Sequence, residues 1–330
     1  MLGRSKTLCY DVVVKKKQTT VELISEFAAE LGYKVEKIDT NNTGDVICVR
    51  KSEKICLIDG QQFGYYPTNL RWQSALLKDK ITLQKFLNQH NLRTIPSKFF
   101  RKHDYKNYTS LRKELQKINL KFPLLLKPAN GFGGASISIL ETKRDLNVIS
   151  KLHYESGKDF IIQPILQHPE YRIFIAHGKI MAIHSKNHKY ILSDGKRSIA
   201  EQLTRIPEHM KSKVFIKTFL KSKKWTLQSI PAEKEKIYYH LVKDNTKEFL
   251  ITENFPPHMK RWAQKLHVIL NAGIVGVDVF TPNGIDDPAS FIIIELNANP
   301  SLRDYAQTYK RRDLSKKIFA LELQKYFRNR

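Results

Sequence analysis

The sequence contains little cysteine, no long apolar run and few acidic residues. Its three cysteines, Cys9, Cys48 and Cys56, form no CxxC pair, which argues against a disulfide framework and favours a reducing compartment. No apolar stretch approaches the roughly 20 residues that span a bilayer. The N-terminal segment "MLGRSKTLCYDVVVKKK" has no apolar core of signal-peptide length. We therefore expect a cytoplasmic protein that has no membrane partner.

The scarcity of acidic residues leaves a large positive charge. Asp and Glu number 32 against 57 Lys and Arg, so the formal net charge is +25. One interpretation of this excess is solubility alone. The other is a polyanionic partner, such as nucleic acid, a nucleotide, a membrane surface or an acidic peptide. The densest basic runs are "KSKVFIKTFLKSKK" at 211–224 and the last thirty residues. The sequence leaves both interpretations open.

The chain has room for about two domains, and an apolar fraction of 41% is enough for a folded core. Helix-like and strand-like segments alternate along it. Thr19 and Glu22 form a capping-box pattern at the start of one helix. The segment "YRIFIAHGKIMAIHSK" predicts a hairpin that turns at Gly178. This mixture favours an α+β or α/β enzyme.

A glycine-rich loop lies within "KPANGFGGASISIL", residues 127–140. Backbone amides that glycine leaves exposed can bind phosphate oxygens. The residues after the loop alternate with a period of two, so the loop is expected to join two strands. A Walker loop or a dinucleotide-binding loop would instead open a helix. We therefore expect a hairpin that closes over a nucleotide, with the ammonium of Lys127 near a phosphate.

Polar residues occur at alternate positions in the otherwise apolar stretch "FIIIELNANPSLRD", residues 291–304. Side chains alternate faces along a strand, so the pattern predicts one shared face for Phe291, Ile293, Glu295 and Asn297. If this strand pairs with "GIVGVDVF" across the turn "NGIDDPAS", Asp278 becomes the direct neighbour of Glu295, with Cβ atoms about 5 Å apart.

Two facing carboxylates repel each other unless a cation lies between them. Mg²⁺ prefers one or two carboxylates together with substrate phosphates, and Asn297 adds a third oxygen on the same face. The alternative interpretation is a solvated hairpin with its acids on the wet side. The apolar residues that flank the acids favour the metal site.

Six segments with these features resemble the ATP-grasp superfamily, and in particular the ATP-grasp domains of cyanophycin synthetase and of bifunctional glutathione synthetases. They occur in the family's order, as "LLKDKITLQKFLNQHNLRTIP", "FPLLLKPANGFGGASISI", "FIIQPILQHPEYRIFIAHGKIMA", "LSDGKRSIAEQL", "GIVGVDVF" and "IIIELNANPSLR". The resemblance implies an α+β ATP-grasp fold, in which two α+β subdomains grip ATP. It implies an N-terminal α/β domain at 1–75 and an ATP-grasp domain at 76–330, divided into a lid subdomain at about 97–163 and a metal and substrate subdomain at 164–330.

The resemblance also implies roles for individual residues. Those that would bind ATP are Lys80, Lys127, Gly131, Gly133, Gly134, Gln163, Leu166 and Glu170. Those that would bind Mg²⁺, with Mn²⁺ as the alternative ion, are Asp278, Glu295 and Asn297. Arg172 and Arg303 would lie near the transferring phosphate or the acceptor. Lys186, Lys196 and Arg197 would form a basic cluster on the substrate side.

Three departures from the family pattern accompany this resemblance. Gln163 occupies a hinge position where the family usually has Glu. The turn after the last strand contains "NPSL" where "NPGL" or "NPGF" is usual. The segment "HLVKDNTKEFLITE" lacks the family's Gly-Gly pair, a departure that bears on the acceptor pocket and on part of the phosphate grip.

The implied activity is ATP-dependent ligation. ATP phosphorylates a carboxylate to an acylphosphate, and an amine then attacks to give an amide or peptide bond, ADP and phosphate. The acceptor would be an amino acid or a peptide, and the excess charge favours an anionic one. Two other functions stay open: phosphorylation of an acceptor without ligation, and nucleic-acid binding with a vestigial ATP site. The chain has no recognisable nucleic-acid module, which disfavours the last. Assembly into a homo-oligomer is also left open.

Overall fold

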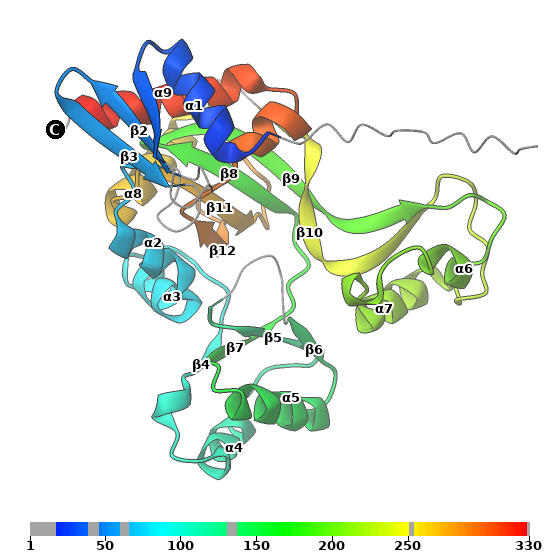
Figure 1. The fold of residues 1–330 in the computed structure, drawn as a ribbon. Helices are drawn as coiled ribbons and strands as arrows, with labels where there is room; N and C mark the ends of the chain where they lie inside the picture. The colour runs from blue at the N-terminus through cyan, green and yellow to red at the C-terminus, as the bar shows by residue number, and fades with distance from the viewer. Residues whose placement is uncertain (1–17, 39–45, 60–65, 131–136, 251–253, 329–330) are drawn as a thin grey trace, which may run out of the picture. The chain divides into compact units, whose positions relative to one another are not determined.

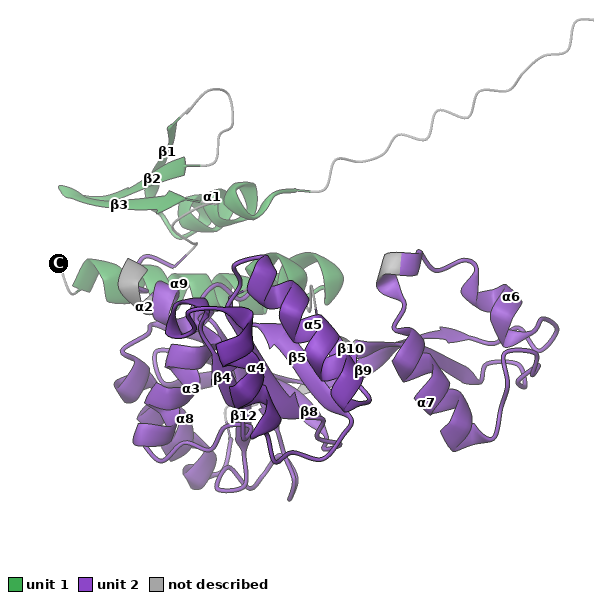
Figure 2. Cartoon of the chain, turned by 90° about the horizontal axis from the view of Figure 1, so that it is seen from below, with its two compact units in different colours: residues 1–65, 301–330 green, residues 66–300 purple. Residues whose placement is uncertain are grey.

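The computed structural model of the protein describes residues 18–38, 46–59, 66–130, 137–250 and 254–328 (Figure 1). The chain forms two compact units, which Figure 2 distinguishes by colour. Unit 1 consists of residues 1–65 and 301–330, and unit 2 consists of residues 66–300.

Unit 1 contains a three-stranded antiparallel sheet, in the order β1-β2-β3, and two long helices. Its elements are α1 (Thr20–Glu30), β1 (Lys34–Ile38), β2 (Val46–Lys51), β3 (Lys54–Asp59), the π-helical turn η3 (Asp304–Thr308) and α9 (Arg312–Arg328). The predicted capping box is confirmed: Thr19 accepts the backbone N–H of Glu22, and the Glu22 carboxylate accepts the backbone N–H of Thr19. Helices α1 and α9 pack together through Phe27 and Phe319, whose ring centroids are 6.4 Å apart.

The two units differ from the predicted domains at both ends of the chain. The boundary falls after residue 65 rather than 75, and residues 301–330 belong to unit 1. The reason is a set of long-range contacts from α9: the Tyr326 hydroxyl donates to the Ile55 carbonyl at 3.0 Å, across 271 positions of sequence. No local pattern indicates such a contact. The division into an N-terminal domain and an ATP-grasp domain stays a prediction.

Unit 2 is built on a five-stranded antiparallel sheet in the order β10-β9-β8-β11-β12. Its strands are β8 (Glu170–Ala176), β9 (Lys179–Leu192), β10 (Lys236–Leu250), β11 (Ile274–Phe280) and β12 (Ile292–Asn297). The predicted hairpin between β8 and β9 is confirmed, and Gly178 turns it with a φ of +77°, a conformation that glycine adopts without strain.

Helices cover one face of this sheet. They are α2 (Arg71–Lys78), α3 (Lys80–Gln89) and α8 (Pro257–Leu270). The core between them contains Val275, Val277 and Val279 of β11 together with Trp262 and Leu266 of α8. The opposite face of β11, which carries Asp278, is thereby left to face the rest of unit 2. None of the helices within the described ranges is both long and apolar enough to cross a membrane.

Residues 98–164 of unit 2 form a smaller lobe, which we call the lid lobe. Its elements are β4 (Lys98–Phe100), the 3₁₀ turn η1 (Lys102–Asp104), α4 (Tyr108–Gln116), β5 (Leu124–Pro128), β6 (Ser138–Leu140), α5 (Lys143–Glu155) and β7 (Phe160–Pro164). The sheet order is β4-β7-β5-β6. Strands β5 and β6 pair antiparallel, so the prediction that the glycine-rich loop joins two strands is confirmed.

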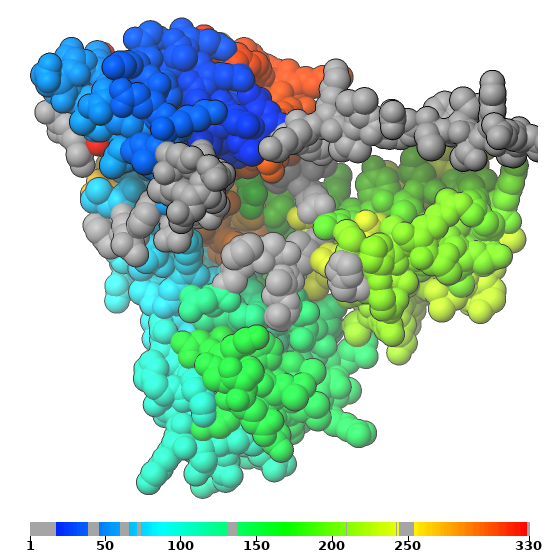
Figure 3. Space-filling view, viewed as in Figure 1, coloured from blue at the N-terminus to red at the C-terminus, as the bar shows by residue number. Residues whose placement is uncertain are grey.

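The long strands β9 and β10 extend away from the sheet and carry a third part of unit 2, which we call the arm (residues 186–243; Figure 1). The arm adds α6 (Ile199–Leu203), the 3₁₀ turn η2 (Glu208–Met210) and α7 (Lys213–Lys223). Its own small core contains Ile199, Ile216, Leu220 and Ile237. Figure 3 shows the lid lobe and the arm as separate bulges of the surface.

Candidate active site

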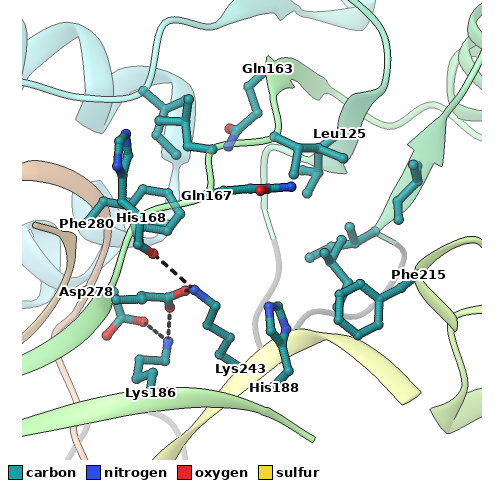
Figure 4. A pocket seen from close by; sticks show the side chains of 18 of the residues that line it. Leu125, Gln163, Gln167, His168, Lys186, His188, Phe215, Lys243, Asp278 and Phe280 are labelled. Atoms are coloured by element: carbon teal, nitrogen blue, oxygen red, sulfur yellow. Dashed lines mark hydrogen bonds and ion pairs between the residues drawn. The ribbon is translucent and has the colours of Figure 1, made fainter. Parts of the chain in front are cut away.

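A pocket of about 660 Å³ lies within unit 2 (Figure 4). This volume is in the range of small-molecule and nucleotide sites. The lid lobe, the hinge at residues 164–169, the five-stranded sheet and α7 all contribute to its lining. One end of the pocket is charged, and the other is mainly apolar.

The charged end lies on the face of β11 that the helices leave open. Asp278 pairs in register with Glu295 of β12 on one side and with Arg172 of β8 on the other. The prediction that Asp278 and Glu295 are cross-strand neighbours is therefore confirmed. Asn297, two positions along β12, pairs with Gly276 on the same face as this pair, but it does not line the pocket.

The prediction of one shared face for Phe291, Ile293 and Glu295 is wrong. The register of β11 and β12 shifts, so that Glu295 lies opposite Asp278 while Ile293 lies opposite Val279. Ile294 is the extra residue of a β-bulge, and a bulge reverses the alternation of faces beyond it. Phe291 and Ile293 consequently pack in the helix-covered core, whereas Glu295 lines the pocket.

Asp278 is neutralised within the protein by two cations. Its carboxylate accepts from Arg172 Nε at 2.6 Å and from Lys186 Nζ at 2.9 Å. Asp278 is only 5% exposed. Burial by itself would raise the pKa of Asp278, but the charges of Lys186 and Arg172 together hold that pKa below its ordinary value. Arg172 and Lys186 thus supply positive charge beside the two facing carboxylates, where we expected an added cation.

Lys186 also links Asp278 to a second carboxylate. Its ammonium lies 2.6 Å from Glu170 Oε1, and Lys243 lies 3.6 Å from Glu170 Oε2. Lys243 further donates to the His168 carbonyl at 3.3 Å and lies over the Phe280 ring at 5.5 Å. Figure 4 shows Asp278, Lys186 and Lys243 gathered at this end. The four side chains form a chain of alternating charges along the pocket wall.

Lys243 is a site residue that the sequence analysis missed. It lies on β10, in the segment that lacks the family's Gly-Gly pair. Two irregularities in the pairing of β9 with β10 flank it, one before Lys243 and one after Asn245. Its approach to Glu170 therefore follows from strand pairing, and no local signal in the sequence indicates it.

Two further lysines line the charged end from other elements. Lys80 begins α3 and Lys127 lies in β5, and they are 7% and 6% exposed. Burial lowers the pKa of Lys127 to about 8, against the opposing influence of the Glu295 charge. Two buried lysines at one end of a pocket suit a polyanionic ligand, because their positive charges would attract its negative groups.

The other end of the pocket is lined by apolar side chains. Figure 4 shows Leu125 and Phe215 away from Asp278, whereas Phe280 lies beside His168, nearer the charged end. Leu166 of the hinge also lines the pocket. Gln163 is buried there, and its Oε1 has no hydrogen-bond partner among the described residues. An unsatisfied buried acceptor beside a flat apolar slot suits a planar ligand that carries an amino group.

Six other predicted site residues lie away from the pocket or outside the described residues. Gly131, Gly133 and Gly134 are outside the described residues. Arg303 belongs to unit 1, whereas the pocket lies in unit 2. Lys196 and Arg197 do not line the pocket; Arg197 Nε instead donates to Asp194 of its own loop at 2.6 Å. The structure thus brings Lys186 into the pocket without the other two members of the predicted basic cluster.

A metal site made of acids and amides is consistent with the donor atoms present. Asp278 and Glu295 offer carboxylate oxygens, which are the ligands that hard divalent cations prefer. Within the described ranges, no group of three or more His, Cys, Asp and Glu side chains is arranged to hold a metal ion. A site here would therefore need Asn297 or the oxygens of a ligand to complete it.

The chain is similar in sequence to curated glutathione biosynthesis bifunctional proteins. No protein-family model matches the chain. The glutathione biosynthesis bifunctional protein of Clostridium perfringens is 23% identical, over 78% of this chain and 36% of its own length. That of Streptococcus agalactiae is 24% identical, over 57% of this chain and 28% of its own length. The chain therefore spans about a third of the curated relatives that it matches.

A solved structure shows the same fold. The crystal structure of a bifunctional glutathione synthetase from Pasteurella multocida superposes with a TM-score of 0.55 over 93% of this chain and 44% of that chain, at 17% sequence identity. The predicted resemblance to bifunctional glutathione synthetases is confirmed, and the chain shares the α+β fold of that structure.

Proposed function

We propose that the protein is an ATP-dependent ligase that joins a carboxylate to an amine through an acylphosphate, releasing ADP and phosphate. One observation carries this proposal: the pocket brings the Asp278–Glu295 pair together with the buried lysines Lys80 and Lys127. The shared fold and the sequence similarity to glutathione biosynthesis bifunctional proteins support it.

The pocket residues fit a bound nucleotide. Lys80 and Lys127 would contact the phosphates, whose negative charges would attract both lysines. The unsatisfied Oε1 of Gln163 would accept a hydrogen bond from the amino group of adenine, and Leu166 would lie against the adenine ring. Glu170 would accept a ribose hydroxyl. Lys186 and Lys243, which both contact Glu170, would hold that side chain in place against the pocket wall.

Mg²⁺, with Mn²⁺ as the alternative ion, would be held by Asp278 and Glu295, with Asn297 as a further oxygen donor. When bound, the ion would neutralise charge on the phosphate oxygens. A carboxylate oxygen has two acceptor sites. Asp278 could therefore bind an ion while it keeps one of its two present partners.

The protein's own cations would act on the reacting groups. Phosphoryl transfer needs positioning and charge neutralisation more than a protein nucleophile. Arg172 and Lys186, which flank Asp278, would stabilise the transferring phosphoryl group. An acidic amino acid or acidic peptide is the proposed acceptor class, and Lys196, Arg197 and Arg303 stay predicted acceptor residues.

A product assay tests the proposal. The protein would be incubated with Mg-ATP and a panel of amino acids and dipeptides that includes acidic ones. We expect phosphate and ADP to be released only when both a carboxylate and an amine are present, and mass spectrometry should detect the condensed product. A phosphorylated product formed without an added amine would identify a phosphotransferase. No turnover across a panel extended to longer acidic peptides would contradict both enzyme functions.

Nucleotide binding is expected to take up a proton at alkaline pH. Lys127 has a lowered pKa of about 8 in the folded protein, so its ammonium is largely deprotonated at about pH 9. A bound phosphate favours the charged form and raises that pKa. Calorimetry at about pH 9 in buffers of different ionisation enthalpy should therefore show uptake of up to one proton, and at about pH 6 Lys127 should contribute none.

The same shift fixes the pH dependence of the ligand-free protein. The unfolded state binds more protons than the folded state above pH 8, so Lys127 makes stability rise as pH increases from about 8 towards 10.

The control for the calorimetric experiment is Lys98→Met, which removes an exposed lysine and should leave the proton uptake unchanged. Nucleotide binding at about pH 9 without proton uptake would show that Lys127 does not contact the phosphates.

A further inference from the structure

Helix α7 of the arm presents three different faces. Ile216 and Leu220 pack in the small core of the arm. Val214, Phe215 and Thr218 line the pocket. The third face carries Lys213, Lys217 and Lys221, all exposed, at positions i, i+4 and i+8 along the helix. We call these three residues the lysine face.

The lysine face lies directly beside the pocket face. Successive residues of an α-helix are rotated by about 100°, and each of Val214 and Thr218 follows a lysine of the face by one residue. A molecule that lies along the lysines therefore meets the mouth of the pocket at Val214 and Thr218.

The lysine face is unfavourable for the helix itself. Like charges at i and i+4 repel and destabilise a helix. Lys213 also lies in the first turn, where the helix dipole disfavours positive charge. Lys217 and Lys221 make no salt bridge with a described residue closer than 4.0 Å, whereas Lys213 lies 3.2 Å from Glu208. A partner of opposite charge would remove this repulsion, so the lysine face suits an external anionic ligand.

The arm around α7 is strongly basic. Residues 186–243 contain fourteen Lys and Arg but only five Asp and Glu. Three of those acids are engaged within the arm: Asp194 pairs with Arg197, Glu208 with Lys211 and Lys213, and Glu235 with Lys223. A fourth, Glu201, accepts from Ser198 at the start of α6. The charge of the lysine face is consequently left to attract anions from solution.

We propose that the lysine face is a docking surface for an acidic polypeptide, and that this polypeptide is the substrate whose reacting group enters the pocket. The inference rests on the proposed ligase function and specifies its substrate class. The spacing is suitable, because lysines four residues apart rise about 6 Å along a helix. Alternate side chains of an extended peptide are spaced by about 6.6 Å.

The surroundings favour a peptide over a nucleic acid. Single-stranded nucleic acids bind to exposed aromatic side chains on which their bases stack. The rings of and around α7 are in contact with one another instead: Phe215 lies 4.6 Å from His188, and Phe219 lies 5.3 Å from Tyr238, between ring centroids. The lysine face itself contains no aromatic residue.

Binding of a labelled ten-residue polyglutamate peptide, followed by fluorescence anisotropy at low salt, tests the proposal. The triple variant Lys213→Gln, Lys217→Gln, Lys221→Gln should bind the peptide about tenfold more weakly than the unaltered protein, with a smaller dependence on salt. A matched control, Lys98→Gln, Lys113→Gln, Lys143→Gln, removes three exposed lysines of the lid lobe and should reduce binding by less than twofold.

Other outcomes would overturn the inference. Equal losses in the two triple variants would mean that net charge alone attracts the peptide. Tighter binding of a ten-residue oligothymidylate, with a larger loss in the α7 variant, would identify a nucleic-acid surface. Stabilisation by Mg-ATP, measured as a shift in Tm, should be the same in all three proteins. Its absence from the unaltered protein would refute the proposed function but not the peptide docking.

Discussion

Asp278→Asn is expected to abolish ATP-dependent turnover and to lower the stability of the ligand-free protein by about 3 kcal/mol. The carboxylate is buried and compensates both Arg172 and Lys186, so its loss leaves each of these cations with one counter-charge fewer. Glu295→Gln should abolish turnover equally while leaving stability nearly unchanged. No side chain within the described ranges forms a salt bridge with Glu295 closer than 4.0 Å, and its removal relieves repulsion from Asp278.

The contrast between the two variants separates the metal role from the structural role. Urea denaturation without ligand would measure stability, and the Tm shift with Mg-ATP would measure binding, which both variants should lose. Asp286→Asn, in the exposed turn between β11 and β12, is the matched control and should behave like the unaltered protein. Wild-type turnover in either site variant would refute the metal assignment. A stable, inactive Asp278→Asn protein would show that its ion pairs add little.

Lys186→Met is expected to give the second-largest effect, a loss of turnover of about 10²- to 10³-fold. Its ammonium lies within 2.9 Å of both Asp278 and Glu170, so the variant leaves these two carboxylates with one cation fewer each. Their mutual repulsion should also weaken nucleotide binding. Steady-state kinetics with varied Mg-ATP would separate the loss in kcat from the rise in KM.

Lys179→Met provides the control for this variant. Lys179 is an exposed residue at the start of the same strand, β9, so the change removes one lysine without touching the pocket. It should retain both turnover and nucleotide affinity. If Lys186→Met were as active as this control, the lysine would serve only to balance charge, and the transferring phosphoryl group would have to be stabilised by Arg172.

The alternation of residue types along the chain was enough to predict the main strands of the site. Apolar runs with polar interruptions predicted β11 and β12, and the turn residues between them predicted that they pair. The structure confirms that Asp278 lies opposite Glu295. It also confirms the capping box at Thr19 and the strands on both sides of the glycine-rich loop. These features depend on spacing and backbone preference, which are local properties of a sequence.

Local patterns failed where the backbone departs from regular geometry. The bulge at Ile294 separates the faces of Ile293 and Glu295, although their spacing in sequence places them together. A bulge inserts one residue into the ladder, and the apolar run around Ile294 gives no sign of where the insertion falls. The assignment of residues to faces was therefore correct for Glu295 and Asn297 but wrong for Phe291 and Ile293.

Local patterns in the sequence were enough to predict the fold class and the pairing of the two acids. Tertiary structure decided what surrounds those acids. Arg172 and Lys186 reach Asp278 across 106 and 92 positions of sequence, and Lys243 reaches Glu170 from a strand of irregular register. Tertiary structure also separated Lys186 from Lys196 and Arg197, which lie close to it in sequence. Charged side chains from distant segments come into contact where their strands pair. The register of that pairing is set by packing over the whole sheet rather than by any single segment.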